Sequence, residues 1–211
     1  MKIINASFEI LAATPNLEQT IELAGRTCYK SEDKITDDSA EAFVAKIRSI
    51  NHESVLEHGS ITVKFVVDRG VSHELVRHRL VSFSQESSRF CNYGKDKFGM
   101  EVTFIDIRGG FPGISPESYS IWESACEHAE ACYLDMLSAG GSKPQEARSV
   151  LPSSLKTEVV MTANPREWRH VIKLRAAEAS HPQMREVIVP MAAEFAKRWP
   201  ALFGDLKQPE A

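Results

Sequence analysis

Residues 61–89 read ITVKFVVDRGVSHELVRHRLVSFSQESSR, and the patterns in this segment set the expected fold. Ile61 to Asp68 alternates apolar and polar residues, which is typical of a half-buried strand. Gly70 breaks that pattern, and Ser72 is placed to cap a short helix that carries Arg77-His78-Arg79. The Ser-rich stretch that follows is expected to be irregular. The segment therefore predicts a strand, a short helix and a basic loop in succession.

Outside this segment, strand and helix patterns are mixed along the chain. Further strands are expected at Lys2–Leu11, Glu101–Ile107 and Thr157–Thr162. Helices are expected to begin at Thr14-Pro15, Ser39, Ser115-Pro116, Asn164-Pro165 and Pro182. The elements follow no βαβ rhythm and no GxGxxG follows a strand, which argues against a doubly wound nucleotide-binding fold. The sequence predicts one α+β domain over residues 1–211, with mixed helices and a mainly antiparallel sheet.

The overall composition limits the class of protein. The chain has 211 residues, and its net charge of −4 argues against a general nucleic-acid-binding protein, which is usually basic. The N-terminus lacks the apolar run of a signal peptide, and no window approaches the length of a membrane span. Cys28, Cys91, Cys126 and Cys132 form no CxxC pair and no zinc-like spacing. We therefore expect free thiols, a cytoplasmic location and no association with membranes or nucleic acid.

The stretch from Arg77 to Arg89 carries three guanidiniums, one imidazole and four hydroxyls. A planar fork of donors that keeps its charge suits a phosphate better than a core. Successive helical residues point about 100° apart, so Arg77, His78 and Arg79 cannot all face one ligand from a regular helix. Either their roles are divided or the helix ends among them. For the triplet alone, a solvated basic turn is the simpler alternative.

Two other clusters carry polar residues that could line a site. In His52-Glu53-Ser54-Val55-Leu56-Glu57-His58 the histidines are six residues apart, which does not match the HExxH pattern of a zinc site. Capping of a helix end is the structural alternative for this element. In the second cluster, Arg166 and His170 share a helix face behind Asn164. The alternative there is a cap by Asn164 and two surface cations.

Two single arginines also stand out. Arg175 follows the apolar residues Val171, Ile172 and Leu174, so its stem is expected to be largely buried and its charge to need a partner. A structural ion pair is the alternative to a binding role. Arg148 lies in the segment Glu146-Ala147-Arg148-Ser149-Val150-Leu151-Pro152.

Four motifs, in the right order along the chain, resemble the signature of the flavin-dependent thymidylate synthases. They are the His52–His58 element, the RHR run followed after seven residues by Ser87, the Ala147–Pro152 element, and the segment from Asn164 to Arg175. The resemblance implies reductive methylation of dUMP to dTMP, with FAD as cofactor and with NADPH and 5,10-methylenetetrahydrofolate as co-substrates. It also implies a flavin site that is not of the Rossmann type and holds no metal.

The resemblance assigns two sets of contacts. FAD would be bound by His52, Ser54, Glu57, Arg77, His78, Arg79, Asn164, Arg166 and His170. The dUMP would be bound by Glu74, Arg77, Glu86, Ser87, Ser88, Arg89, Arg148 and Arg175. Glu74 stands where many members of the family are expected to have Gln, and its carboxylate would repel a phosphate unless Arg77 or Arg89 intervenes. Some members have Asn where His170 stands.

Catalytic roles fall to Arg175 and Ser87. The resemblance implies that Arg175 holds and polarises the uracil ring, which is a preorganised electrostatic role. Ser87 has no visible His–Asp partnership in the sequence, and a serine needs an adjacent base to act as a nucleophile at neutral pH. We therefore expect Ser87 to position the substrate through a hydrogen bond, while the cofactors carry the methylation chemistry.

The resemblance further implies a homotetramer with active sites shared between subunits, and the dispersion of the motifs along the chain agrees with that. Two other classes of function stay open from the residues alone. One is a module that binds single-stranded nucleic acid through the RHR loop, although aromatic residues near the loop are few. The other is a magnesium-dependent nucleotide hydrolase that uses Glu53, Glu57 and Glu86, although these carboxylates form no clustered motif.

Overall fold

The computed structural model describes residues 1–206 of the chain. These residues divide into two compact units, and the chain passes between them several times. The first unit comprises residues 1–7, 65–77 and 84–159, and the second comprises residues 8–64, 78–83 and those from 160 onward. No described helix is both long enough and apolar enough to cross a bilayer. All four cysteines are free, as the sequence predicts.

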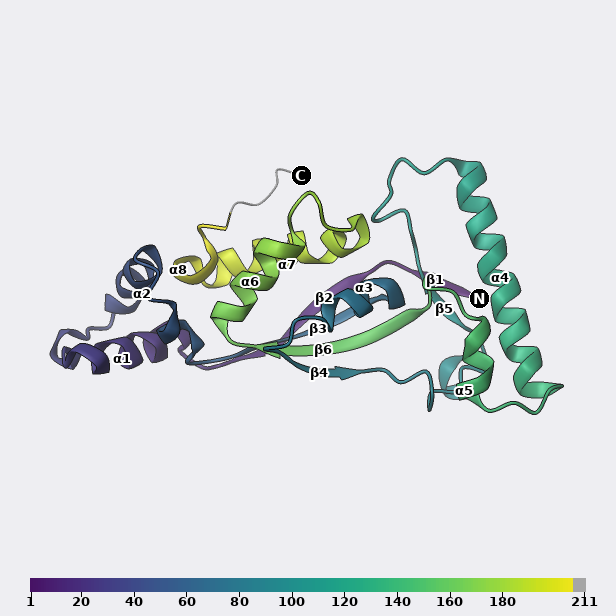
Figure 1. Cartoon of the computed structure of the whole chain (residues 1–211), viewed down its shortest axis with the longest axis horizontal. Helices are drawn as coiled ribbons and strands as arrows, with labels where there is room; N and C mark the ends of the chain where they lie inside the picture. Colours follow the sequence, from purple (N-terminus) through teal and green to yellow (C-terminus); the bar gives the residue numbers. More distant parts are fainter. Residues whose placement is uncertain (207–211) are drawn as a thin grey trace. The chain divides into compact units, whose positions relative to one another are not determined.

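Four strands form a sheet with the order β2-β3-β6-β4 (Figure 1). Its strands are β2 (Ser7–Ala13), β3 (Ile61–Asp68), β6 (Lys156–Ala163) and β4 (Ser82–Gln85). Along β3 and β6, residues alternate between buried and half-buried, so one face of each strand lies against the core. The half-buried strand predicted from Ile61 to Asp68 is confirmed. The α+β class with a mainly antiparallel sheet is confirmed as well.

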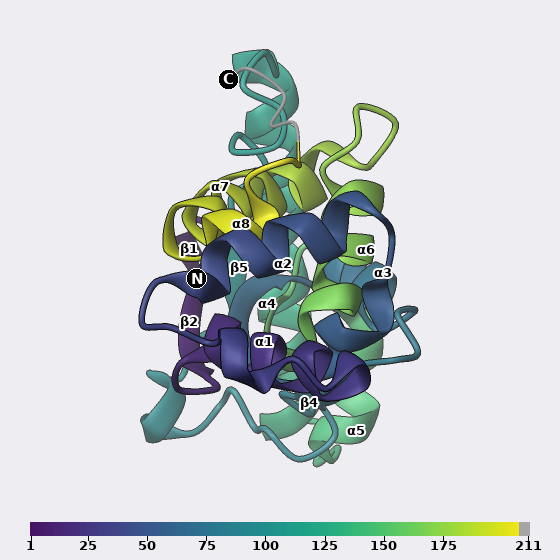
Figure 2. The same cartoon turned by 90° about the vertical axis from the view of Figure 1, so that its left-hand side faces the viewer.

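The second unit is mainly helical. It contains α1 (Leu17–Tyr29), α2 (Ser39–Ser49), α6 (Pro165–Arg175), α7 (Pro182–Arg198) and α8 (Pro200–Phe203), with 3-10 turns η1 (Glu32–Lys34) and η2 (Glu53–Glu57). Helix α2 contacts both α1 and α8, and the three lie close together in Figure 2. Trp168 of α6 is fully buried against Phe195 of α7, and its Nε1 donates to the carbonyl of Ile61 at 2.9 Å. This core fixes α6 against the end of β3.

The first unit has a separate core. Strand β1 (Lys2–Ile4) pairs in parallel with β5 (Thr103–Ile105), and α4 (Pro116–Ser138) contacts α5 (Pro144–Ala147) and the 3-10 turn η4 (Arg148–Val150). Helix α3 (Arg69–Leu75) and the 3-10 turn η3 (Asp96–Phe98) complete the unit. Its core cluster of buried side chains consists of Tyr93, Val102, Phe104, Cys126, Tyr133, Ala147 and Leu155.

Several predicted helix starts are confirmed by their caps. The hydroxyl of Ser115 accepts from the backbone N–H of Ser118, and the Oδ1 of Asn164 accepts from the N–H of Glu167 at 2.8 Å. In both helices proline follows the cap, where its missing N–H removes no helical hydrogen bond.

Other predicted boundaries are wrong, each for a local reason. Helix α3 is capped by Asp68, whose Oδ1 accepts from the N–H of Val71, while Ser72 lies inside the helix. The helix ends at Leu75, so the RHR run lies beyond it. Ser39 is the first residue of α2 and not its cap, because its hydroxyl is bound to Glu22 and Thr36. The long first strand is divided into β1 and β2.

Candidate functional site

The first unit brings Ser88 and Arg148 together. Ser88 is buried, and its hydroxyl accepts from Nη1 of Arg148 at 3.1 Å across 60 residues of sequence. One residue further along, the Nε of Arg89 donates to Oε1 of Gln145 at 3.1 Å. These two contacts place the loop after β4 against α5 and η4. Three residues that the motifs assign to dUMP therefore lie in one region of the first unit.

A cavity of about 360 Å³ lies beside this region and is strongly cationic. Its lining residues are Arg89, Phe90, Asn92, Lys95, Lys143, Pro144 and Gln145. They include one guanidinium and two ammonium groups but no carboxylate, which favours an anionic ligand. Lys95 and Lys143 were not predicted from the sequence. No motif distinguishes them from other lysines, because they join Arg89 only through the folding of residues 89–95 against α5.

Glu86 is held by two partners in the first unit. Its Oε2 accepts from Nζ of Lys156 at 3.0 Å, and its Oε1 accepts from the hydroxyl of Tyr93 at 3.1 Å. Burial, together with the nearby Glu86 carboxylate, raises the pKa of Tyr93 well above its ordinary value, so Tyr93 remains a donor. Lys156 also loses solvation by burial, yet its hydrogen bonds to Glu158 and Glu86 raise its pKa overall. Glu86 is thus fixed in place by two hydrogen bonds.

The remaining predicted residues of the first unit are Glu74, Arg77 and Ser87. Within the described residues, the hydroxyl of Ser87 makes no hydrogen bond, while its carbonyl accepts from the backbone N–H groups of Phe90 and Cys91. Glu74 lies on α3, and its carbonyl accepts from the N–H of Arg77. Arg77 is exposed and is the last residue of this segment of the unit. Over residues 1–206, no base is hydrogen-bonded to the Ser87 hydroxyl in a way that would activate it.

The last two residues of the RHR run belong to the second unit and differ in exposure. His78 is buried and Arg79 is exposed. The Nε2 of His78 accepts from Nε of Arg175 at 3.0 Å, and its Nδ1 lies 3.7 Å from Oε1 of Glu167. The ring of His170 packs edge-on against that of His78, with 5.7 Å between the ring centroids. His78 thus connects the loop before β4 to three side chains of α6.

Burial lowers the pKa of His78 to about 4, and the charges of Arg175 and His170 act in the same direction. The imidazole is therefore neutral at physiological pH. Its contact with Glu167 is one between a carboxylate and a neutral ring, although the two atoms lie within ion-pair distance. A neutral imidazole also explains how Nε2 can accept from the guanidinium.

A second cavity, of about 380 Å³, lies in the second unit between α1, the η2 turn and α6. His52, Ser54 and Arg166 line it, so three residues assigned to FAD converge there. The Nη1 of Arg166 lies 2.5 Å from Oε1 of Glu57, and its Nε lies 3.6 Å from Oε2 of Glu53. Glu57 therefore joins this group through Arg166 and does not itself line the cavity.

The α1 side of this cavity was not predicted from the sequence. It is formed by Gly25, Cys28 and Tyr29. The hydroxyl of Tyr29 lies 3.4 Å from Nδ1 of His52 and is within hydrogen-bonding distance of it. A Cβ at position 25 would come within 2.6 Å of the Phe43 ring, so glycine allows α1 to approach α2 here. These residues continue the ordinary amphipathic pattern of a helix, which gives no sign of a site.

Asn164 is committed to the structure of α6, because its Oδ1 caps the helix. The capping role, which was the alternative to FAD binding, is therefore observed for Asn164, and its contact with FAD remains a prediction.

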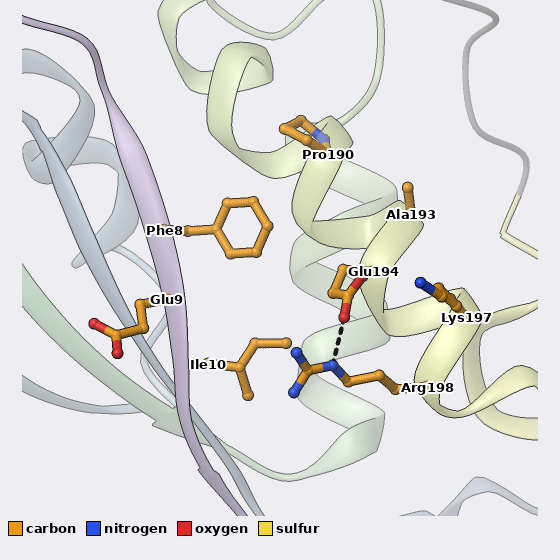
Figure 3. A pocket seen from close by; sticks show the side chains of 8 residues that line it. All are labelled: Phe8, Glu9, Ile10, Pro190, Ala193, Glu194, Lys197 and Arg198. Carbon is orange, nitrogen blue, oxygen red and sulfur yellow. Dashed lines mark hydrogen bonds and ion pairs between the residues drawn. The ribbon is translucent and has the colours of Figure 1, made fainter.

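A third cavity, of about 550 Å³, lies between β2 and α7 (Figure 3). It contains none of the predicted site residues, and Arg198 at its edge is already paired with Glu194 at 2.6 Å.

The residues around the second cavity fit the phosphate and sugar groups of a dinucleotide cofactor. Arg166 is half exposed and can donate several hydrogen bonds to phosphate oxygens, while His52 and Ser54 offer further polar groups. The first cavity carries positive charge suited to a phosphate monoester.

Among the described residues, Glu53, Glu57 and Glu86 do not form a group of metal ligands. A magnesium-dependent hydrolase is therefore not supported.

Comparison with known proteins identifies the family. A family model described as "Thymidylate synthase complementing protein" matches residues 9–201. The chain is 33% identical to "Flavin-dependent thymidylate synthase" of Geobacter sulfurreducens, over 93% of this chain and 84% of that protein. It is 32% identical to the protein of the same name from Corynebacterium glutamicum, over 90% and 80% of the two chains.

A solved structure with a similar fold is consistent with the family of these relatives. The UMP/dUMP methylase PolB from Streptomyces cacaoi, bound with 5-Br dUMP, superposes with a TM-score of 0.78 and is 25% identical. The similarity covers 97% of this chain and 96% of the other. The family model, the relatives and this structure all cover the four motifs and both units. The chain therefore belongs to the flavin-dependent thymidylate synthase family.

Proposed function

We propose that this protein methylates dUMP to dTMP with FAD, taking the carbon from 5,10-methylenetetrahydrofolate and the reducing equivalents from NADPH. Membership of the flavin-dependent thymidylate synthase family supports both a flavin cofactor and this class of reaction. The cationic cavity beside Ser88 and Arg148 is the observation in this structure that best supports a nucleotide monophosphate as substrate. Neither the fold nor the relatives support a nucleic-acid-binding module.

The residues of the first unit would bind the nucleotide. The guanidinium of Arg89 and the ammonium groups of Lys95 and Lys143 would neutralise the phosphate. Ser88 and Arg148, already joined by a hydrogen bond, would hold the sugar and phosphate in a fixed orientation. Ser87 would donate its hydroxyl to the substrate, since no described hydrogen bond occupies that hydroxyl.

The residues of the second unit would hold FAD. Arg166, with His52 and Ser54, would bind its polar groups, and Glu57 would keep Arg166 in place. Arg79 is exposed and carries a full positive charge for the same ligand. When bound, the flavin supplies the electrons that reduce the transferred carbon to a methyl group.

Arg175 would hold the uracil ring and stabilise the negative charge that develops on the ring during methylation. Its guanidinium is part-buried and restrained by His78, which limits the reorganisation needed during the reaction. The chain thus contributes binding, orientation and electrostatics.

Further expectations concern assembly and location. A single domain is supported by a family match that extends over both compact units. We propose a homotetramer in the cytoplasm with active sites shared between subunits. Mixing two impaired variants, Arg175→Ala and His52→Ala, at limiting FAD should then give more activity after subunit exchange than either variant gives alone. No recovery despite demonstrated exchange would contradict shared sites.

The visible spectrum of the purified protein with added FAD tests the cofactor. A protein-bound flavin band that is retained on gel filtration is expected. If FAD elutes separately under conditions in which the protein is folded, and no weaker binding is found by titration, the proposed cofactor is wrong.

A further inference from the structure

Glu167 lies beside the His78–Arg175 pair, and the sequence motifs assign it to neither FAD nor dUMP. It is the third residue of α6 and is only 8% exposed. Its backbone N–H is held by the Asn164 cap, which fixes the first turn of the helix and with it the position of the side chain. A carboxylate this deeply buried requires polar partners. His78 is one of them, with Nδ1 at 3.7 Å from Oε1 of Glu167.

The contact with Arg175 determines where the His78 proton lies. An arginine side chain only donates hydrogen bonds, so Nε2 of His78 must be unprotonated to accept from Nε of Arg175. The proton of the neutral ring is therefore on Nδ1, and that atom faces Glu167. Glu167 stabilises this tautomer because a carboxylate attracts an N–H and repels a lone pair.

We propose that Glu167 is a positioning residue that acts through His78 to orient Arg175. The carboxylate keeps His78 in the Nδ1–H tautomer, and that tautomer in turn presents a lone pair to the Nε–H of Arg175. The arrangement resembles a carboxylate–histidine pair in which the acid fixes the tautomer and orientation of the ring. This inference rests on the proposed function, which assigns Arg175 to the uracil ring.

The distance of 3.7 Å is longer than a normal hydrogen bond. Hydrogen bonds in sites without substrate are often long and shorten when the ligand binds. The burial of both His78 and Glu167 excludes water as a strong competitor and increases the effect of the carboxylate on the ring.

Metal binding is a different use of the same side chains. Ligand atoms of His78, Glu167 and His170 lie within 4.8 Å of one another. However, Nε2 of His78 already accepts from Arg175, and coordination through Nδ1 would require the other tautomer and the loss of that hydrogen bond. The Arg175 charge would also repel a cation. The relay through His78 accounts for the contacts of Glu167 and Arg175 with this ring.

Histidine-selective ¹⁵N NMR of the FAD-loaded protein tests the relay together with steady-state kinetics. Wild type should show His78 protonated at Nδ1. Glu167→Ala should give a mixture of tautomers and lower kcat by roughly tenfold, the loss expected for one hydrogen bond. Glu167→Gln retains an acceptor oxygen and should restore both the Nδ1–H signal and most of kcat. Glu178→Ala, an exposed glutamate just after α6, is the control and should match wild type.

An Nε2–H tautomer in wild type, or an unchanged Nδ1–H signal in Glu167→Ala, would overturn the relay. If Glu167→Ala does not fold, Glu167→Met keeps the side-chain length and replaces it in the comparison. The NMR result does not depend on turnover. A wild-type enzyme that makes no dTMP would therefore refute the proposed function. The His78 tautomer measured by NMR would still show whether Glu167 acts through His78.

Discussion

The Nε atom of Arg175 donates a hydrogen bond to Nε2 of His78 at 3.0 Å, joining residues that lie 97 positions apart. The sequence motifs assign His78 to FAD and Arg175 to dUMP. Two residues that the motifs assign to different ligands are therefore joined by a direct side-chain hydrogen bond within the second unit. Because the bond requires a neutral, Nδ1-protonated imidazole, the protonation state of His78 affects the geometry of Arg175.

Acid should destabilise the protein through His78. Its pKa in the folded state is about 4, mainly because of burial, against an ordinary value of 6.5. The unfolded state therefore binds more protons between these values, and the free energy of unfolding should fall as pH decreases from about 6.5 to 4. Between pH 7 and pH 5 this group should account for roughly 2 kcal/mol at most.

Urea unfolding of wild type and His78→Asn at the two pH values measures this effect. The variant should lose less stability on acidification than wild type, while His128→Asn, an exposed control on α4, should behave like wild type. Asp106 and Asp205 have pKa values lowered below 3.8, and their contribution falls outside this window. Equal pH dependence in His78→Asn and wild type would show that His78 is not buried in the neutral form.

FAD affinity should depend on the cavity between α1, η2 and α6. His52→Ala removes a polar side chain that lines it, and Arg79→Ala removes an exposed positive charge from the RHR run. Each should weaken FAD binding by roughly tenfold, as expected for the loss of one hydrogen bond. Fluorescence titration measures the affinity, with exposed His58→Ala as the control. Unchanged affinity in both variants would place FAD elsewhere.

The KM for dUMP should depend on the cationic cavity of the first unit. Lys143→Ala and Arg89→Ala each remove one of its three positive groups, and each should raise KM by roughly tenfold or more. The effect should diminish at high salt, because exposed charges are screened. Lys46→Ala, which removes an exposed lysine on α2, should leave KM unchanged. A KM that does not respond to either cavity variant would remove the support for a phosphate at this position.

Ser87→Ala distinguishes a positioning hydroxyl from a covalent nucleophile. No described base contacts Ser87, so the variant should lose transition-state stabilisation of roughly 1.5–3 kcal/mol and still form dTMP. Loss of a true nucleophilic serine would instead lower the rate by a factor on the order of 10⁶. The measurement is product formation under saturating dUMP. A folded Ser87→Ala enzyme that binds both ligands normally but makes no detectable dTMP would contradict the positioning role.

Local patterns predict the parts of this fold that local chemistry determines. The strand at Ile61–Asp68 and the caps at Ser115 and Asn164 follow from alternation and from short polar side chains before proline. The cap of α3 was mispredicted because Asp68 and Ser72 both suit the position, and only the folded chain shows that Asp68 reaches the N–H of Val71.

Motifs mark some of the residues that line the candidate cavities, but not those that reach a cavity only through folding. His52, Ser54 and Arg166 converge on one cavity as their motifs imply. Lys95, Lys143 and Tyr29 have no distinguishing pattern, because each joins its cavity through contacts distant in sequence. The contact of Glu167 with His78 could not be predicted either. Glu167 follows a helix cap in the sequence, and only the folded chain shows that its side chain faces His78.

The most direct test of the proposed function is an omission assay for dTMP. The purified protein is incubated with dUMP, methylenetetrahydrofolate, NADPH and FAD, and the nucleotide products are separated and identified by mass. We predict that dTMP forms in the complete mixture and that omission of any one component abolishes or strongly reduces it. A folded, FAD-loaded enzyme that leaves dUMP unchanged in the complete mixture, or that forms dTMP equally well after all flavin is removed, would contradict the proposal.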